Sequence, residues 1–178
     1  MGEIHEPVPV LLVVAVSSRY DAALQWARER IDAALGPLAL VSDAFEFTET
    51  DYYTSTMGRD LKKQFVASQR LIDSAAVAVV KRMTNDWEAE YAALGRHPEP
   101  RPLNLDPGYI TPAKLVLAST KDHAHRLHLR DGIYAEVTLI YRHHAWQPME
   151  WTYPDFRRTD YQEFFTKCRE YLLAQRRG

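Results

Sequence analysis

The sequence of 178 residues predicts an α+β fold in which helices pack on one face of a mostly antiparallel sheet. Three observations support this prediction. An apolar, β-branched run at 8–16 is followed by a helical pattern and a second extended segment, which is the order of a β-α-β unit. Strand patterns with a hairpin signal lie within 113–142, and a last helical pattern covers 160–175. We therefore expect a ferredoxin-like arrangement with extra hairpin strands, in a single domain spanning 1–178.

Local patterns predict the elements of the first half. An apolar stripe at helical spacing predicts a helix over 19–35, and Gly36-Pro37 ends it. Residues 38–47 alternate aromatic and polar side chains near their end, which predicts a second extended segment. A polar loop, two helices and a proline-rich loop are then expected at residues 48–58, 59–73, 75–94 and 95–107.

Three polar residues recur on the helix expected at 75–94. Lys81, Asn85 and Glu88 follow each other at i, i+4 and i+7, so they share one face of that helix. Two interpretations are open for this face: a solvated helix surface, or a polar surface that takes part in a site.

The second half is expected to contain strands at 113–120, 124–129 and 133–142. A two-residue turn at Asp131-Gly132 would mix charges into the apolar face of the hairpin, whereas a three-residue loop over 130–132 keeps the two faces separate. In that register Arg126 lies opposite Glu136, either as an exposed cross-strand ion pair or as part of a polar site. The apolar face would consist of Leu127, Leu129, Ile133, Ala135, Val137 and Leu139.

Composition and charge exclude several classes of partner. The formal net charge of −2 gives no general attraction to nucleic acid or to an anionic membrane, so neither is expected as a partner. The apolar run at 8–16 is too short to span a bilayer, and its acidic flank differs from the basic start of a signal peptide. Cys168 is the single cysteine, which is typical of a cytoplasmic protein.

A turn is predicted at Asp106-Pro107-Gly108-Tyr109, because proline suits the second position of a type II turn and glycine the third. Asn104 and Asp106 point in the same direction from an extended approach, which suits a metal or a hydroxyl-bearing ligand. Turn formation alone also explains the proline and the glycine. A role of Asp106 in a site is therefore one of two interpretations.

Two long apolar strands are expected to end in similar polar sequences, Ser17-Ser18-Arg19 and Ser119-Thr120-Lys121. Each end offers hydroxyl groups, backbone N–H groups and one cation, and a helix N-terminus follows the first end, which favours an anion. We expect a phosphate or carboxylate between these two ends. Capping with a surface cation is the alternative for Ser18 and Arg19.

Motifs for metals and cofactors are weak or missing. His123 and His125 could face the same side of a strand, but no cysteine and no third ligand at a suitable spacing accompany them, so no metal site is predicted. The sequence contains no GxxxxGK[ST] loop, no GxGxxG after the first strand and no GxSxG elbow. No cofactor is assigned.

Several segments form a set that runs over nearly the whole chain: Asp51-Tyr52-Tyr53, Met57-Gly58, Lys81, Thr84-Asn85, Glu88, 104–109, Ser119-Thr120-Lys121, His125-Arg126, 132–139 and 151–155. With this set the chain resembles a bacterial family described as a domain of unknown function, DUF4416, whose members are often labelled GTP-binding proteins. The resemblance implies a single-domain bacterial protein with a shared polar site, and it implies no particular reaction. Thr54-Ser55-Thr56 departs from the acidic residue that many members carry before Met57, so no carboxylate role is carried over there.

One function compatible with these patterns is binding of a small anionic, phosphate- or nucleotide-like ligand, with or without catalysis. Lys121 and Arg126 would hold the anion. Glu136 or Asp106 would act as a base or an orienting group, and His125 would carry the proton. Further residues expected to bind the ligand are Asn104, Tyr109, Ser119, Thr120 and Lys81.

The second compatible function is a non-catalytic interaction module, in which the aromatic segment 146–156 contacts a partner protein. Burial distinguishes the two hypotheses. Convergence of the charged residues in one pocket favours ligand binding, whereas exposure of Trp146 and Trp151 on a flat patch favours the interaction module. The sequence indicates no oligomeric state.

Overall fold

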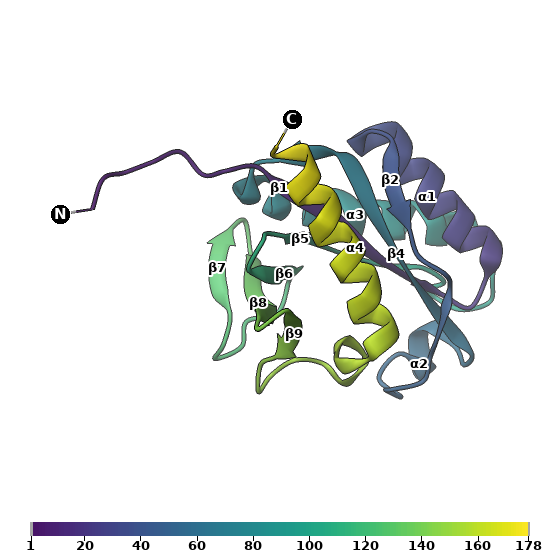
Figure 1. Cartoon of the computed structure of the whole chain (residues 1–178). Coiled ribbons are helices and arrows are strands. Elements are labelled where there is room, and N and C mark those ends of the chain that lie inside the picture. The colour runs from purple at the N-terminus through teal and green to yellow at the C-terminus, as the bar shows by residue number, and fades with distance from the viewer. Residues whose placement is uncertain (1, 178) are drawn as a thin grey trace.

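The computed structural model describes residues 2–177, which form a nine-stranded sheet with helices on both sides (Figure 1). The strands follow in the order β2-β4-β1-β5-β6-β8-β7, while β3 pairs with β4 and β9 pairs with β8. Neighbouring strands are antiparallel. The strands are β1 (Val10–Ser18), β2 (Leu38–Val41), β3 (Phe45–Phe47), β4 (Leu61–Ile72), β5 (Asn104–Ile110), β6 (Lys114–Ser119), β7 (Leu127–Arg130), β8 (Ile133–Arg142) and β9 (Ala145–Pro148).

Helices cover both faces of the sheet, so the prediction of helices on one face is wrong. α1 and α3 pack on the face of β1 that carries Leu12 and Val14, whereas α4 packs on the face that carries Leu11 and Val13 (Figure 1). The apolar run of β1 has no polar alternation, and a strand of that kind needs cover on both faces. Within the described residues the helices are α1 (Asp21–Leu35), α2 (Thr54–Met57), α3 (Val77–Ala93) and α4 (Thr159–Gln175), with 3₁₀ turns η1 (Ser74–Ala76) and η2 (Pro154–Arg157).

The chain opens with β1, α1 and β2 in the predicted order. β4 lies between β1 and β2 and is antiparallel to both, so β1 and β2 run parallel to each other. The extended segment predicted at 38–47 is divided into β2 and β3, and both of these strands pair with β4. The opening unit is therefore a β-α-β unit with a third strand inserted.

β4 replaces the helix predicted over 59–73, so that prediction is wrong. Phe65 and Ala67 of this strand belong to the core under α4, whereas Val66 belongs to the core under α1 and α3. Leu61 and Phe65 have a spacing that also suits a helix. Because β4 is buried on both faces, the alternation that would identify a strand is weak, and tertiary contacts decide its structure.

The turn predicted at 106–109 is also wrong, because these residues lie inside β5. Asp106 and Pro107 pair with β1, and Gly108 pairs with Leu117 of β6. A Cβ atom at Gly108 would lie 2.2 Å from the carbonyl oxygen of Val116. Glycine is therefore required here by the close approach of β6, and not by a turn.

The hairpin of β7 and β8 contains a two-residue turn rather than the predicted three-residue loop. Asp131 and Gly132 have φ angles of 51° and 72°, and a bulge between His128 and Arg130 restores the predicted pairing of Leu127 with Ala135. The predicted apolar face is wrong in β7, because Leu127 and Leu129 are 76% and 41% exposed on an edge strand. On the polar face, by contrast, Arg126, Glu136 and Thr138 are buried, whereas His128 is exposed.

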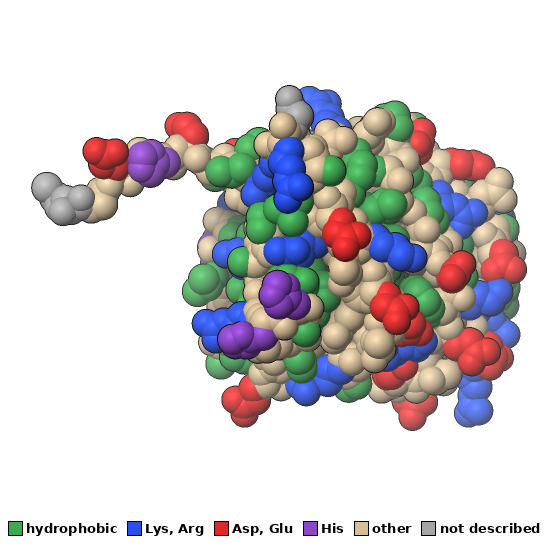
Figure 2. Space-filling view, in the orientation of Figure 1, with side chains coloured by type: hydrophobic (Ala, Val, Ile, Leu, Met, Phe, Trp, Pro, Cys, Tyr) green, Lys and Arg blue, Asp and Glu red, His purple; other side chains and the backbone are tan. Residues whose placement is uncertain are grey.

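The surface seen in Figure 2 carries Lys and Arg side chains interspersed with Asp and Glu side chains. Residues 2–9 are exposed and extend away from the sheet (Figure 1). In the part of the chain that the structure describes, no helix is both long enough and apolar enough to cross a membrane.

We predict that Gly108→Ala lowers the free energy of unfolding by more than about 3 kcal/mol, because the new methyl group overlaps the backbone of β6. Gly95→Ala is the matched control. Gly95 has a φ angle of 62° and no atom within 4 Å of the added Cβ, so only backbone strain of about 1 kcal/mol is expected. Urea unfolding of the three proteins measures the difference. Equal costs for the two substitutions would contradict the proposed packing.

Candidate functional site

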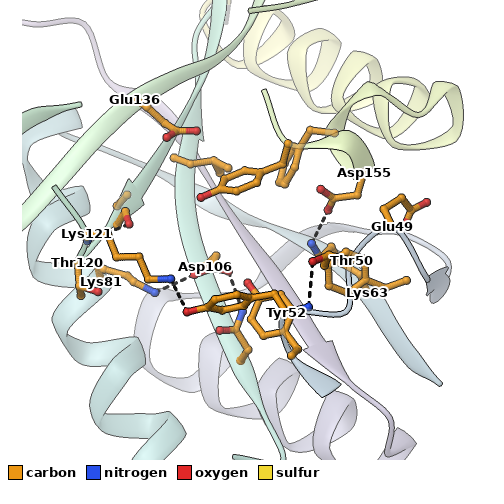
Figure 3. A pocket seen from close by; sticks show the side chains of 18 of the residues that line it. Glu49, Thr50, Tyr52, Lys63, Lys81, Asp106, Thr120, Lys121, Glu136 and Asp155 are labelled. Atoms are coloured by element: carbon orange, nitrogen blue, oxygen red, sulfur yellow. Dashed lines mark hydrogen bonds and ion pairs between the residues drawn. The ribbon is translucent and has the colours of Figure 1, made fainter. Parts of the chain in front are cut away.

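A cavity of about 630 Å³ lies where β5 and β6 separate (Figure 3). Among the described residues, β5 pairs with β6 only through Gly108–Ile110 and Leu115–Leu117. Beyond these pairs, Asn104 and Asp106 of β5 line one side of the cavity. Residues 118–121, at the end of β6 and directly after it, line another side. The volume is in the range of small-molecule sites in proteins.

Side chains of α3 take the place of a neighbouring strand at Leu105. The Leu105 N–H group donates to Oε1 of Glu88 over 2.7 Å, and the Leu105 carbonyl accepts from Nζ of Lys81 over 2.9 Å. Lys81, Asn85 and Glu88 all line the cavity, and Lys81 is buried. The shared face of these three residues is therefore a wall of the cavity and not a solvated helix surface.

Asp106 lies in a network that keeps it ionised. Lys81 donates to its Oδ1 over 2.9 Å, Asn104 donates to its Oδ2 over 2.7 Å, and Arg101 donates to the side-chain Oδ1 of Asn104. Burial would raise the pKa of Asp106, but the Lys81 charge and the two hydrogen bonds outweigh it and hold the pKa at about 2. A carboxylate of this kind suits the orienting role predicted for Asp106 better than the role of a base.

Glu88 has the opposite electrostatic environment. Burial raises the pKa of Glu88, and the charges of Lys81 and Arg101 offset part of this increase. Arg101 donates to its Oε2 from Nε and Nη2, over 3.1 and 2.9 Å. Among the cavity carboxylates, Glu88 is therefore better suited to proton transfer than Asp106.

Arg126 and Glu136 form a buried ion pair, so the interpretation as an exposed pair is wrong. Nε of Arg126 lies 2.7 Å from Oε2 of Glu136, and both side chains are 2% exposed. The guanidinium group also donates to the Ser119 hydroxyl, the Lys121 carbonyl and the Tyr153 hydroxyl, over 2.8, 2.9 and 2.7 Å. Most donors of Arg126 are thus engaged, and this residue fixes the wall of the cavity rather than offering its charge freely.

Lys121 lies at the mouth of the cavity and is exposed (Figure 3). Its Nζ donates to the Tyr52 hydroxyl over 2.6 Å and lies 4.3 Å from the centre of the Tyr52 ring. This hydrogen bond and the Lys121 charge lower the pKa of Tyr52. Within residues 2–177 Lys121 forms no ion pair with a carboxylate, which leaves its charge available to a ligand.

Lys63 and Asp155 form a second buried pair, on the other side of the cavity from Lys121 and Glu136 (Figure 3). Their charged atoms are 2.5 Å apart, and the side chains are 7% and 5% exposed. The Lys63 ammonium group also lies 3.7 Å from the centre of the Phe47 ring. Lys63 was missed because its segment was predicted to be helical.

Most, but not all, of the predicted site residues line the cavity. Tyr109 does not, because it packs against Val77 and Ala78 of α3. His125 lies outside the cavity wall, where its Nε2 is 3.0 Å from Oε2 of Glu136 and its ring stacks on Trp151. The residues that line the cavity as predicted are Lys81, Asn104, Asp106, Ser119, Thr120, Lys121, Arg126 and Glu136.

The first predicted strand end does not contribute to the cavity lining. Ser18 is buried and donates to the Pro102 carbonyl over 2.7 Å. Arg19 pairs with Glu99 over 3.0 Å. The alternative interpretation of these two residues, as structural groups, therefore agrees better with the observed contacts.

Further lining residues come from the loop before α2, the segment before β5 and the segment around η2. Lys63, Phe65 and Ala67 share one face of β4, but the residues between them give no clear polar and apolar alternation, so the sequence offers little signal for a strand there. Tyr52, Tyr53, Tyr153 and Asp155 belong to the segments that carry the family resemblance, but their chemistry gives no local signal. The lining residues not predicted as site residues include Phe47, Glu49, Thr50, Tyr52, Tyr53, Lys63, Asn85, Glu88, Arg101, Tyr153, Asp155 and Phe156.

The aromatic segment 146–156 packs largely on the protein itself. Trp146 is buried, and its Nε1 donates to Thr166 of α4. Trp151 is half-buried, and its Nε1 donates to the Val137 carbonyl over 2.9 Å. Tyr153 is exposed but lines the cavity. These contacts give little support to a flat aromatic patch for a partner protein.

The described residues contain no group of three or more His, Cys, Asp and Glu side chains arranged to hold a metal ion. The rings of His123 and His125 stack with their centres 5.8 Å apart. Cys168 lies on the buried face of α4, and burial raises the pKa of its thiol.

The fold and the site define a mixed α/β protein with a charged cavity between two separating strands. The chain belongs to the family described as a domain of unknown function (DUF4416), whose model matches residues 8–171. This match confirms the family resemblance. No curated protein and no solved structure matches the chain.

We predict that Asp106→Asn destabilises the protein at neutral pH and that this effect decreases in acid. The folded pKa of Asp106 is about 2, below its unfolded value, so its stabilising contribution is present above about pH 4 and is lost as the pH falls toward 2. Removing the charge leaves Lys81 buried without its counter-ion. We expect a cost of about 2 kcal/mol in the free energy of unfolding, which is less than for a fully buried pair because the carboxylate is partly exposed.

Urea unfolding at several values between about pH 7 and about pH 3 measures this effect. Asp122→Asn, which changes an exposed carboxylate in the loop after β6, is the matched control. A difference between Asp106→Asn and wild type that stays constant over the whole range would show that Asp106 is not held ionised as described.

Proposed function

We propose that this protein binds a small anionic molecule in the cavity between β5 and β6. The observation that carries the proposal is convergence: eight residues, from α3, β5, β8 and the β6–β7 region, were predicted from sequence and line one cavity. Residues that serve only folding have no reason to gather ionisable side chains around a hollow of this size.

The anionic group would be received by Lys121, with the Tyr52 hydroxyl as a second partner. Arg126 and Asp106 would position neighbouring lining residues rather than bind the anion directly, because each already forms a hydrogen bond with one of them. Aromatic rings of Phe47, Tyr53 and Phe156 would provide apolar contact for the rest of the ligand. A phosphate- or nucleotide-like ligand and a carboxylate are both compatible with these roles.

The arrangement also supplies groups for acid–base chemistry. Glu136 lines the cavity and bonds to His125, whose ring is partly exposed outside the cavity wall. A proton could therefore move between the solvent and Glu136 through His125, while Glu88 would act on the α3 side. Under this proposal the protein binds a ligand and also carries side chains that could transfer protons to or from it.

We also infer a ferredoxin-like arrangement for the part of the chain from β1 to β5. The order β2-β4-β1-β5 and the position of α1 and α3 over the same face support it. The strands β6 to β9 and α4 would then be additions. In this interpretation the cavity lies at the boundary between the ferredoxin-like part and the added hairpin strands.

A thermal-shift screen of sugar phosphates, nucleotides and small carboxylates tests the proposal. We expect at least one anionic compound to raise the melting temperature of the wild-type protein. The increase should be lost in Lys121→Met and kept in Lys114→Met, because Lys114 is an exposed lysine at the opposite end of β6. No shift with any compound, or shifts that Lys121→Met leaves unchanged, would contradict the proposal.

A further inference from the structure

The Lys and Arg side chains that line the cavity are as many as the carboxylates. Among the described residues, five of each line it, and four of the cations are paired with four of these carboxylates. The pairs are Lys63 with Asp155, Lys81 with Asp106, Arg101 with Glu88, and Arg126 with Glu136.

The remaining carboxylate and the remaining cation differ in their partners. The remaining carboxylate, Glu49, pairs over 2.8 Å with Arg158, which does not line the cavity and also pairs with Asp160 over 2.6 Å. The remaining cation, Lys121, bonds to a neutral hydroxyl, that of Tyr52. Among the lining Lys and Arg side chains of the described residues, Lys121 is therefore the one without a carboxylate partner, and it is exposed.

We infer that the ligand carries a single anionic group, a carboxylate or one phosphate, which binds at Lys121, and that the cavity rejects molecules with several anionic groups. This inference rests on the proposed function and specifies the class of its ligand. Inorganic tripolyphosphate represents the class that would be excluded.

The physical reason is the state of the deeper cations. Lys63, Lys81 and Arg126 are buried, and each is neutralised by a carboxylate within 3 Å. A second anionic group placed beside them would lose its water and would also meet those carboxylates at short range. Breaking a buried pair to receive it would leave the displaced carboxylate without a counter-ion.

The number of free donors leads to the same conclusion. Arg126 uses four hydrogen bonds and Arg101 uses three for lining or neighbouring groups. The Lys121 ammonium group has three N–H donors, and within the described residues its one hydrogen bond is to the Tyr52 hydroxyl. Lys63 also makes one hydrogen bond, but that bond pairs its charge with Asp155. Free donors on a lysine without a carboxylate partner therefore occur at Lys121, which can bind one small anionic group.

Four probes test the inference by calorimetric titration at constant ionic strength: benzoate, phenyl phosphate, benzyl alcohol and inorganic tripolyphosphate. We expect benzoate or phenyl phosphate to bind the wild-type protein, and tripolyphosphate and benzyl alcohol to bind much more weakly. Lys121→Met should weaken binding of the aromatic anion about tenfold, as loss of one charged hydrogen bond predicts, and Lys114→Met should not. The two aromatic anions separate a preference for carboxylate from a preference for phosphate.

Tighter binding of tripolyphosphate than of both aromatic anions, lost in Lys121→Met, would overturn the inference while supporting an anion site. The same holds if tripolyphosphate binds more tightly only when magnesium is present. Equal binding of benzyl alcohol and benzoate would also overturn it, because the anionic group would then have no role. If none of the four probes binds, and no compound in the broader screen raises the melting temperature, the proposed function itself fails.

Discussion

On the side of β5 that faces the cavity, the backbone of Leu105 forms hydrogen bonds with side chains instead of with a neighbouring strand. The cavity depends on this replacement. Its N–H group donates to Glu88 and its carbonyl accepts from Lys81, so both polar groups are satisfied where β6 has moved away. Buried backbone groups need such partners. Because α3 supplies them, β5 and β6 can separate at one end while the sheet keeps a continuous core at the other.

Buried ion pairs then determine the shape of the space between the separated strands. Such pairs add little net stability compared with apolar packing, because both charges lose water. Their main effect is on geometry: Arg126 and Glu136 join β6 to β8, and Lys63 and Asp155 join β4 to η2. Under the proposed function, a ligand would meet walls that are already fixed and largely neutral, and its charge would be recognised at Lys121, which has no carboxylate partner within the described residues.

Sequence alone predicted the elements in which one periodicity dominates. α1, α3 and α4 lie close to their predicted residues because each has a single apolar stripe. The prediction failed for β4, which is buried on both faces. It also failed at Gly108, where a glycine is needed because the neighbouring strand β6 leaves no room for a side chain. Arg126 and Glu136 were paired from sequence because the predicted hairpin register sets them opposite each other, and they are in contact although the predicted loop was wrong. Lys63 was missed because its segment was predicted to be helical, and no local pattern connects it to its partner, Asp155, 92 residues away.

Hydrogen exchange at the Leu105 amide tests most directly whether α3 replaces a strand on β5. In the wild-type protein this amide should exchange as slowly as the amide of Val14 in central β1, because Glu88 accepts its hydrogen bond. In Glu88→Ala the Leu105 amide should exchange about 100-fold faster while Val14 stays unchanged, as expected for a local opening. Rapid exchange of Leu105 in the wild-type protein, or equal exchange in the two proteins, would contradict this account of how the cavity is built.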